Sequence, residues 1–169
     1  MKGYSAKTAL IAAIFLATVP SARAQSSAPE EMQAAKFFVG TWNCAHTVGD
    51  FSGTYTTTIS NALDNRWLKQ TYDFPGTSDG GAPVRAEYFI GYDPRLQQWV
   101  RFGAMSDALY FVMVAKRTGN SWPWTYVLPG KGGSAVYTKR SDSQYTVDGP
   151  TYTQKGKQVT EHHTCKKSP

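Results

Sequence analysis

The two cysteines of this 169-residue chain constrain its fold more than any other feature, because they lie near opposite ends of the part expected to fold. Cys44 follows Gly40-Thr41-Trp42-Asn43, and Cys165 follows His162-His163-Thr164. A disulfide between them would place the first and last segments side by side. It would close a loop of roughly 120 residues, and the chain-entropy model assigns such a crosslink about 4 to 5 kcal/mol of stabilisation. CxxC and Cys-plus-His metal spacings are absent from the sequence, so we expect a structural disulfide.

The N-terminal residues 1–24 have the pattern of a secretory signal peptide. Lys2 and Lys7 precede an apolar run over residues 8–19, and Ser21-Ala22-Arg23-Ala24 fits a small-residue cleavage site. The run is shorter than the roughly 20 residues that span a bilayer, and no later segment approaches that length. We therefore predict an exported protein, periplasmic or secreted, in a compartment where a cysteine pair oxidises.

The basic charge of the chain is modest once this segment is set aside. Without Lys2, Lys7 and Arg23 the formal net charge falls from +6 to +3. The remaining basic residues occur singly or in pairs and form no stripe that would follow a phosphate backbone. We therefore expect no nucleic-acid partner, and the sequence does not determine the oligomeric state.

The rest of the chain is predicted to be one domain, residues 31–169, after a flexible leader at 25–30. Residues 31–39 predict a short amphipathic helix that ends at Gly40. Beyond it, β-branched and aromatic runs alternate with turn residues about every ten positions, which is typical of antiparallel all-β domains. The predicted strands are 41–48, 52–60, 66–74, 84–92, 97–105, 108–117, 122–128, 134–140, 143–148 and 157–166.

These strands predict a closed antiparallel up-and-down β-barrel with the short helix near one mouth. The predicted turns are rich in Gly, Asn, Asp and Pro, and they include Asp93-Pro94 and Asp148-Gly149-Pro150. Closure removes the exposed edges of an open sheet, and it agrees with a disulfide that joins the first strand to the last. About ten strands leave an interior wide enough for a small ligand. The loop from Pro75 to Pro83 either flanks a mouth or is a simple connection.

The opening segment Phe38-Val39-Gly40-Thr41-Trp42 resembles the GxW opening of calycins, the lipocalin and fatty-acid-binding group. With Gly91-Tyr92-Asp93-Pro94 and the segment 161–166, the chain looks most like the bacterial DUF1579-type proteins, which are largely uncharacterised calycin-like barrels. The resemblance covers nearly the whole predicted domain. It implies a barrel whose Trp42 ring packs across the end near the helix, and it supplies no catalytic residues.

The haem-binding nitrobindins are a neighbouring resemblance. They continue the GxW opening with further glycines and use a C-terminal histidine as the iron ligand, whereas Cys44 and His46 occupy the glycine positions here. His162 or His163 is a candidate axial ligand, because one of them must face inward in a regular strand. We expect no cofactor, with haem as the alternative.

A second candidate site follows from the alternation of side chains along the first and last strands. If Trp42 points inward, Cys44 and His46 share its face, and Glu161, His163 and Cys165 share a face of the last strand. Disulfide partners lie on the same side, so His46, Glu161 and His163 are predicted to be neighbours. They form a possible acid, base or metal constellation, or they simply pack beside the disulfide with Glu161 holding an imidazole proton.

Charged and aromatic side chains within other strands supply the predicted ligand-binding residues. Arg101 shares a face with Trp99, and across the Asp93-Pro94 hairpin it could approach Glu87. An inward Arg101 would suit a carboxylate or other anion, whereas an outward one would form a surface ion pair. The aromatic stripes are either core or ligand wall. The full set is Trp42, Trp67, Glu87, Trp99, Arg101, Tyr110, Trp122, Trp124 and Tyr126.

The sequence favours a binding protein over an enzyme. It contains no GxSxG, HExxH, P-loop or GxGxxG motif. We expect an exported protein that holds a small, largely apolar or aromatic molecule inside its barrel. The alternatives are a barrel enzyme of isomerase, cyclase or hydrolase type that uses inward polar residues, a haem protein, and a structural domain with a filled barrel.

Overall fold

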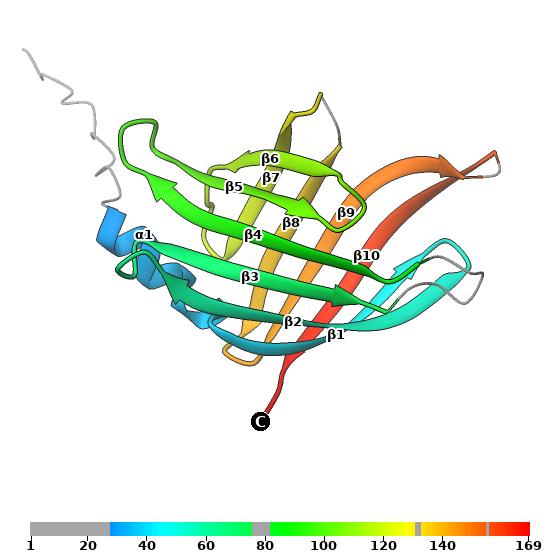
Figure 1. Cartoon of the computed structure of the whole chain (residues 1–169), viewed down its shortest axis with the longest axis horizontal. Helices are drawn as coiled ribbons and strands as arrows, with labels where there is room; N and C mark the ends of the chain where they lie inside the picture. Colours follow the sequence, from blue (N-terminus) through cyan, green and yellow to red (C-terminus); the bar gives the residue numbers. More distant parts are fainter. Residues whose placement is uncertain (1–27, 76–81, 131–132, 155) are drawn as a thin grey trace, which may run out of the picture.

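The computed structural model describes residues 28–75, 82–130, 133–154 and 156–169, and they form a closed antiparallel barrel of ten strands (Figure 1). Each strand pairs with its neighbours along the chain, and β1 pairs with β10 to complete the ring. The strands are β1 (Gly40–Val48), β2 (Phe51–Ala62), β3 (Trp67–Phe74), β4 (Val84–Asp93), β5 (Gln98–Met105), β6 (Tyr110–Ala115), β7 (Ser121–Leu128), β8 (Ser134–Ser141), β9 (Gln144–Gln154) and β10 (Lys157–Lys167). The predicted fold class is confirmed.

Three of the sequence predictions concern residues outside this description, one of them the leader, of which residues 25–27 lie outside it. The signal peptide at residues 1–24 lies wholly outside it, and so do residues 76–81 of the loop between Pro75 and Pro83. Within the described ranges, no helix combines the length and the apolar character needed to cross a bilayer.

The alternation of inward and outward side chains is clearest in β1. Trp42, Cys44, His46 and Val48 are buried, and the residues between them are exposed. Cys44 lies opposite Cys165 in the register of β1 and β10, and the two form the predicted disulfide. The first and last strands are therefore joined by hydrogen bonds and by a covalent bond.

The end of the barrel where β1 begins is closed by a helix, α1 (Ala28–Ala35), and a 3-10 turn, η1 (Lys36–Phe38) (Figure 1). The buried carboxylate of Glu31 accepts hydrogen bonds from Trp99 Nε1, at 2.8 Å, and from the Arg117 guanidinium, at 2.8 and 3.0 Å. Trp42 Nε1 donates to the carbonyl of Phe38 at 2.6 Å. These bonds fasten the helix to the barrel wall.

The helix starts at Ala28 rather than at residue 31, so residues 28–30 of the predicted leader are helical. Pro29 is tolerated in a first helical turn, because the N–H that it lacks would have no partner there. Glu30 and Glu31 in the same turn interact favourably with the positive end of the helix dipole.

Asp148-Gly149-Pro150 is not the turn that its composition predicts. Strand β9 continues through these residues to Gln154. Asp148 pairs with His162 and Thr151 pairs with Thr160, so Gly149 and Pro150 together lie opposite Glu161. This is a β-bulge, a position where glycine and proline are accepted within a strand.

Loss of the disulfide is expected to destabilise the barrel strongly. The bond joins residues 121 positions apart, so removing it restores a large conformational freedom to the unfolded chain. The double variant Cys44→Ser/Cys165→Ser should melt roughly 10 °C or more below the wild type in non-reducing buffer. Wild-type protein melted with excess reductant is the control and should approach the variant. Equal melting temperatures in non-reducing buffer would contradict this expectation.

Candidate functional site

The half of the barrel away from α1 contains a cavity of about 380 Å³ that opens at the mouth. Its wall is unusually rich in tyrosine, with a smaller number of apolar and charged side chains. The tyrosines that line it are Tyr55, Tyr72, Tyr88, Tyr110, Tyr126, Tyr137 and Tyr145. Burial raises the pKa of Tyr55, Tyr72 and Tyr145, and it raises the pKa of Tyr88 to about 12. These hydroxyls therefore stay neutral and can both donate and accept hydrogen bonds.

The half of the barrel next to α1 is filled by side chains. Trp99, Trp122 and Trp124 pack there with Phe38 and leave a void of only about 20 Å³. Trp42 is fully buried at the same end, where its ring meets Tyr145 edge-on. These four tryptophans were predicted as ligand wall, and the structure places them in the packed core beside the helix.

Arg101 projects from β5 into the cavity and is 6% exposed. Its Nη1 donates to the hydroxyl of Tyr137 at 2.6 Å, and its Nη2 donates to Oε1 of Gln70 at 3.1 Å. Its Cζ lies 4.4 Å from the centre of the Tyr88 ring, which gives the cation a favourable aromatic contact. Among the residues that the structure describes, no carboxylate forms an ion pair with Arg101, and its Nε has no hydrogen-bond partner.

The predicted approach of Glu87 to Arg101 is wrong. In the register of β4 and β5, Arg101 pairs with Ile90 and Glu87 pairs with Ala104. An offset of three residues puts the two side chains on opposite faces of the sheet. Glu87 points outward and forms a 2.9 Å ion pair with Lys69 Nζ.

Trp67 also lies outside the cavity, although it was predicted to line it. Its ring covers Gly91, where a side chain would clash with it, and meets the Phe102 ring at 5.6 Å between centroids. Of the nine predicted ligand-binding residues, Arg101, Tyr110 and Tyr126 line the cavity.

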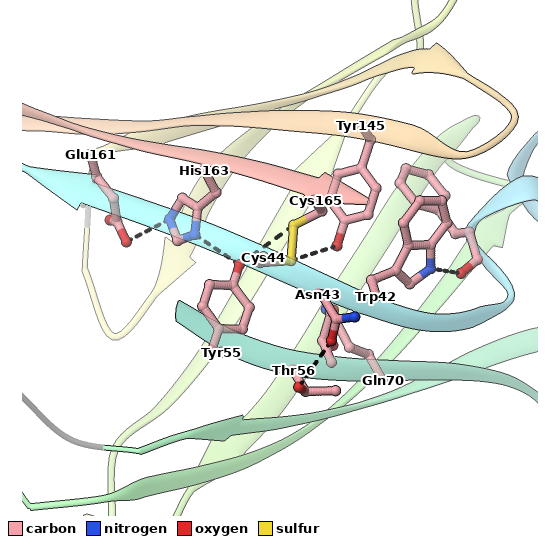
Figure 2. The surroundings of a disulfide bond; sticks show 12 residues. Trp42, Asn43, Cys44, Tyr55, Thr56, Gln70, Tyr145, Glu161, His163 and Cys165 are labelled. Atoms are coloured by element: carbon pink, nitrogen blue, oxygen red, sulfur yellow. Dashed lines mark hydrogen bonds and ion pairs between the residues drawn. A yellow bond between two sulfur atoms is a disulfide. The ribbon is translucent and has the colours of Figure 1, made fainter. Parts of the chain in front are cut away.

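A second polar group lies where β1 meets β10, and Figure 2 shows most of it beside the disulfide. Oε1 of Glu161 lies 2.8 Å from Nε2 of His163 and 3.3 Å from Nε2 of His46. The two imidazole rings stack at 4.5 Å between centroids. The predicted grouping of His46, Glu161 and His163 is therefore present in the structure, and Glu161 and His163 also line the cavity.

Tyr55 extends this group on the other side of His163. Its hydroxyl lies 2.8 Å from Nδ1 of His163, so both nitrogens of that ring are engaged (Figure 2). A carboxylate can only accept, so Nε2 carries the hydrogen and Nδ1 of a neutral ring accepts from Tyr55. His163 therefore offers no free nitrogen to an axial haem iron without first releasing a partner. His162, the other haem candidate, faces outward and contacts Asp148 at 2.6 Å.

The bulge in β9 makes room for Glu161. A side chain at Gly149 would come within 2.8 Å of Cβ of Glu161. The carboxylate therefore lies against bare backbone and reaches both imidazoles. Burial disfavours its ionisation, but the hydrogen bond from His163 and the charge interactions with His163 and His46 outweigh burial and lower the pKa of Glu161 from 4.5 to about 2.

Sequence reasoning missed Gln70 and all the cavity tyrosines except Tyr110 and Tyr126. The alternation Leu68, Gln70, Tyr72 along β3 is a signal for an inward Gln70, because apolar residues flank it at spacing two. No comparable signal separates a cavity tyrosine from a core tyrosine, since both occupy inward positions.

No protein-family model and no curated protein matches the chain. Among solved structures it is similar to a redesigned β-barrel, with 16% sequence identity and a TM-score of 0.47 over 80% of this chain and 96% of that one.

Ionised Glu161 is expected to stabilise the folded protein, and this contribution should be lost at acidic pH. Because its pKa is lower in the folded state, its contribution is fully present above about pH 4.5 and is lost as the pH falls toward 2. Glu161→Gln should lower the free energy of unfolding at pH 7 by at most about 3 kcal/mol and flatten the decline between pH 4.5 and 2. Urea unfolding at several pH values measures both effects.

The matched control is Glu87→Gln, which removes an exposed carboxylate on the outside of the barrel and should leave the pH profile nearly unchanged. If Glu161→Gln and the wild type lose stability in parallel below pH 4.5, the assignment of this acid-sensitive contribution to Glu161 fails.

Proposed function

We propose that the protein is an exported binding protein that holds a small anionic molecule with an aromatic or apolar body in its barrel cavity. The observation that carries the proposal is the buried Arg101, whose charge faces the cavity and has no carboxylate partner among the described residues. The anionic group would bind to Arg101 and the body would lie among the tyrosines.

The energetic argument starts from the cost of burying an arginine. A guanidinium removed from water is costly unless hydrogen bonds or an opposite charge compensate, and it does not lose its proton to avoid that cost. Tyr137 and Gln70 supply two neutral partners. A ligand carboxylate would add the missing charge, and the planar guanidinium suits it because it presents several N–H donors on one side.

The size and lining of the cavity support a molecule with aromatic character. A volume of about 380 Å³ is within the lower part of the range of about 300–1,000 Å³ for small-molecule pockets. Aromatic walls with a few fixed polar groups are typical of such sites. A cavity of this volume also favours binding over the alternative of a completely filled barrel.

Export is proposed from two features. The disulfide is of the kind that persists in oxidising compartments, and the sequence of residues 1–24 has the pattern of a signal peptide. The resemblance to calycin-like barrels agrees with interior binding and stays a prediction.

The test uses a matched pair of ligands, 1-naphthylacetate and its neutral analogue 1-naphthylacetamide, titrated by calorimetry. The wild type is expected to bind the acid at least tenfold more tightly than the amide. Arg101→Met should remove that preference. The loss of charge-assisted hydrogen bonds should weaken the binding free energy of the acid by about 1.5–3 kcal/mol. The melting temperature of the variant should stay equal or rise, because a buried cation is replaced by an apolar chain of similar length.

Arg85→Met is the control, because Arg85 is an exposed arginine of the neighbouring strand β4 and pairs with Asp73. It should keep the preference for the acid. If the wild type binds the two ligands equally, or if a folded Arg101→Met variant keeps the preference, Arg101 is not an anion site. Native mass spectrometry of the purified protein would show in addition whether a natural ligand copurifies.

A further inference from the structure

We propose that His46, Glu161 and His163 form a binding site for one divalent transition-metal ion, with Zn²⁺ as its representative. The site is separate from Arg101, and the proposal does not rest on the binding function given above. It rests on the donor set, its spacing, the lack of a hydrogen bond at either ring nitrogen of His46 and the way in which the barrel fixes the three residues.

The donor atoms are close enough to share one ion. One ligand atom from each residue lies within 4.8 Å of the other two. A tetrahedral zinc ion with bonds of about 2.0–2.1 Å separates its donors by roughly 3.3–3.4 Å. The distance of 3.3 Å between His46 Nε2 and Glu161 Oε1 already has this value, and the 2.8 Å contact of His163 needs to lengthen by only about half an ångström.

His46 supplies the observation that points to a ligand. The residue is 8% exposed, and neither of its ring nitrogens has a hydrogen-bond partner. Its Nε2 is near Glu161, but the contact lacks the geometry of a hydrogen bond. The ring packs edge-on against Phe51 and Phe74. An unpaired buried nitrogen costs free energy, and coordination to a metal would recover it.

Tyr55 can orient His163 for coordination. Its hydroxyl lies 2.8 Å from Nδ1, the nitrogen opposite the one that faces Glu161. Metal binding requires the hydrogen of the His163 ring to move from Nε2, where it faces Glu161, to Nδ1, where it is donated to the oxygen of Tyr55. The lone pair of Nε2 is then free for the metal. Such partners of metal-binding histidines commonly fix the tautomer and the orientation of the ring.

The barrel also holds the donors in place. His46 and His163 are directly opposite each other in the register of β1 and β10, and the Cys44–Cys165 disulfide is two residues away on both strands. Glu161 and His163 line the cavity, so a fourth coordination position could face it. Three protein ligands with an open position are typical of catalytic zinc sites.

The donor types indicate the class of metal. Two imidazole nitrogens and one carboxylate oxygen suit Zn²⁺, Fe²⁺ and neighbouring transition metals. Ca²⁺ and Mg²⁺ prefer sites built from oxygen. We therefore expect Zn²⁺ to bind and Mg²⁺ to bind far more weakly.

The test is a calorimetric titration of ZnCl₂ into chelator-treated protein that carries no histidine tag. We expect one Zn²⁺ per chain and a higher melting temperature when zinc is present, since the ion binds the folded state. Glu161→Gln and His46→Phe should each weaken zinc binding by more than about 100-fold, and Tyr55→Phe should weaken it by about 10- to 100-fold. Mg²⁺ should not compete at equal concentration.

His162→Gln is the matched control, because His162 lies on the same strand but faces outward. It should bind zinc as the wild type does, and so should Arg101→Met, which separates this result from the anion-site test. No zinc binding by the wild type would overturn the proposal. Zinc binding that is lost in His162→Gln but kept in Glu161→Gln would also overturn it, because the ion would then be adventitious.

Wild-type protein loaded with Co²⁺ provides a measurement that does not depend on whether a variant folds. A cobalt ion in a low-coordinate nitrogen and oxygen site should give visible d–d absorption that is stronger than that of aqueous Co²⁺ and is abolished by Zn²⁺. A spectrum identical to aqueous Co²⁺ would count against the site.

Discussion

The pairing of β1 with β10 is the interaction on which the rest of the structure depends. Without it the other nine strand pairs would form an open sheet with two exposed edges, which invites aggregation. The pairing also brings together side chains more than 100 residues apart in the chain, such as Tyr55 and His163. The disulfide joins these two strands. It acts mainly on the unfolded state, where it limits how far apart the first and last segments of the domain can move.

The interior is divided into two halves with different chemistry. Tryptophans and aliphatic side chains fill the half beside α1, and tyrosines surround a cavity in the other half. Gln70 and Tyr137 line both regions, and they are the two residues that hold Arg101. The apolar half contributes burial that stabilises the fold. Polar groups in the other half remain organised because that core supports them.

The polar groups of the cavity do not neutralise one another. Glu161 is engaged by two histidines, and Arg101 is engaged by neutral partners from β3 and β8. A cation and an anion that share a cavity would normally be expected to pair, since each is costly to bury alone. Because Arg101 and Glu161 do not pair, the cavity has one positive and one negative region. This arrangement distinguishes it from a cavity that binds purely apolar molecules.

Most of the fold and part of the site could be predicted from the sequence. Runs of β-branched and aromatic residues between turn residues located the strands. The period-two alternation then placed His46, Glu161 and His163 together, because the cysteines fixed the relation of the first and last strands. Where no such link existed, prediction failed. Glu87 was placed beside Arg101 because the register across a hairpin depends on the geometry of its turn. Gly149-Pro150 looked like a turn because a bulge uses the same residues. The tryptophans could not be assigned to core or cavity, because that depends on how far the helix and its neighbours fill the barrel.

The closed end of the barrel, beside α1 and η1, also determines where a fusion partner or a solid support can be attached without blocking the mouth. Strand β10 ends beside η1, where Lys167 Nζ donates to the carbonyl of Phe37, so both ends of the described barrel lie on the closed side. A fusion partner or a solid support joined at the C-terminus would then leave the mouth facing free solution. The barrel therefore suits immobilisation as a sensor, with its tyrosine chamber still open to the sample.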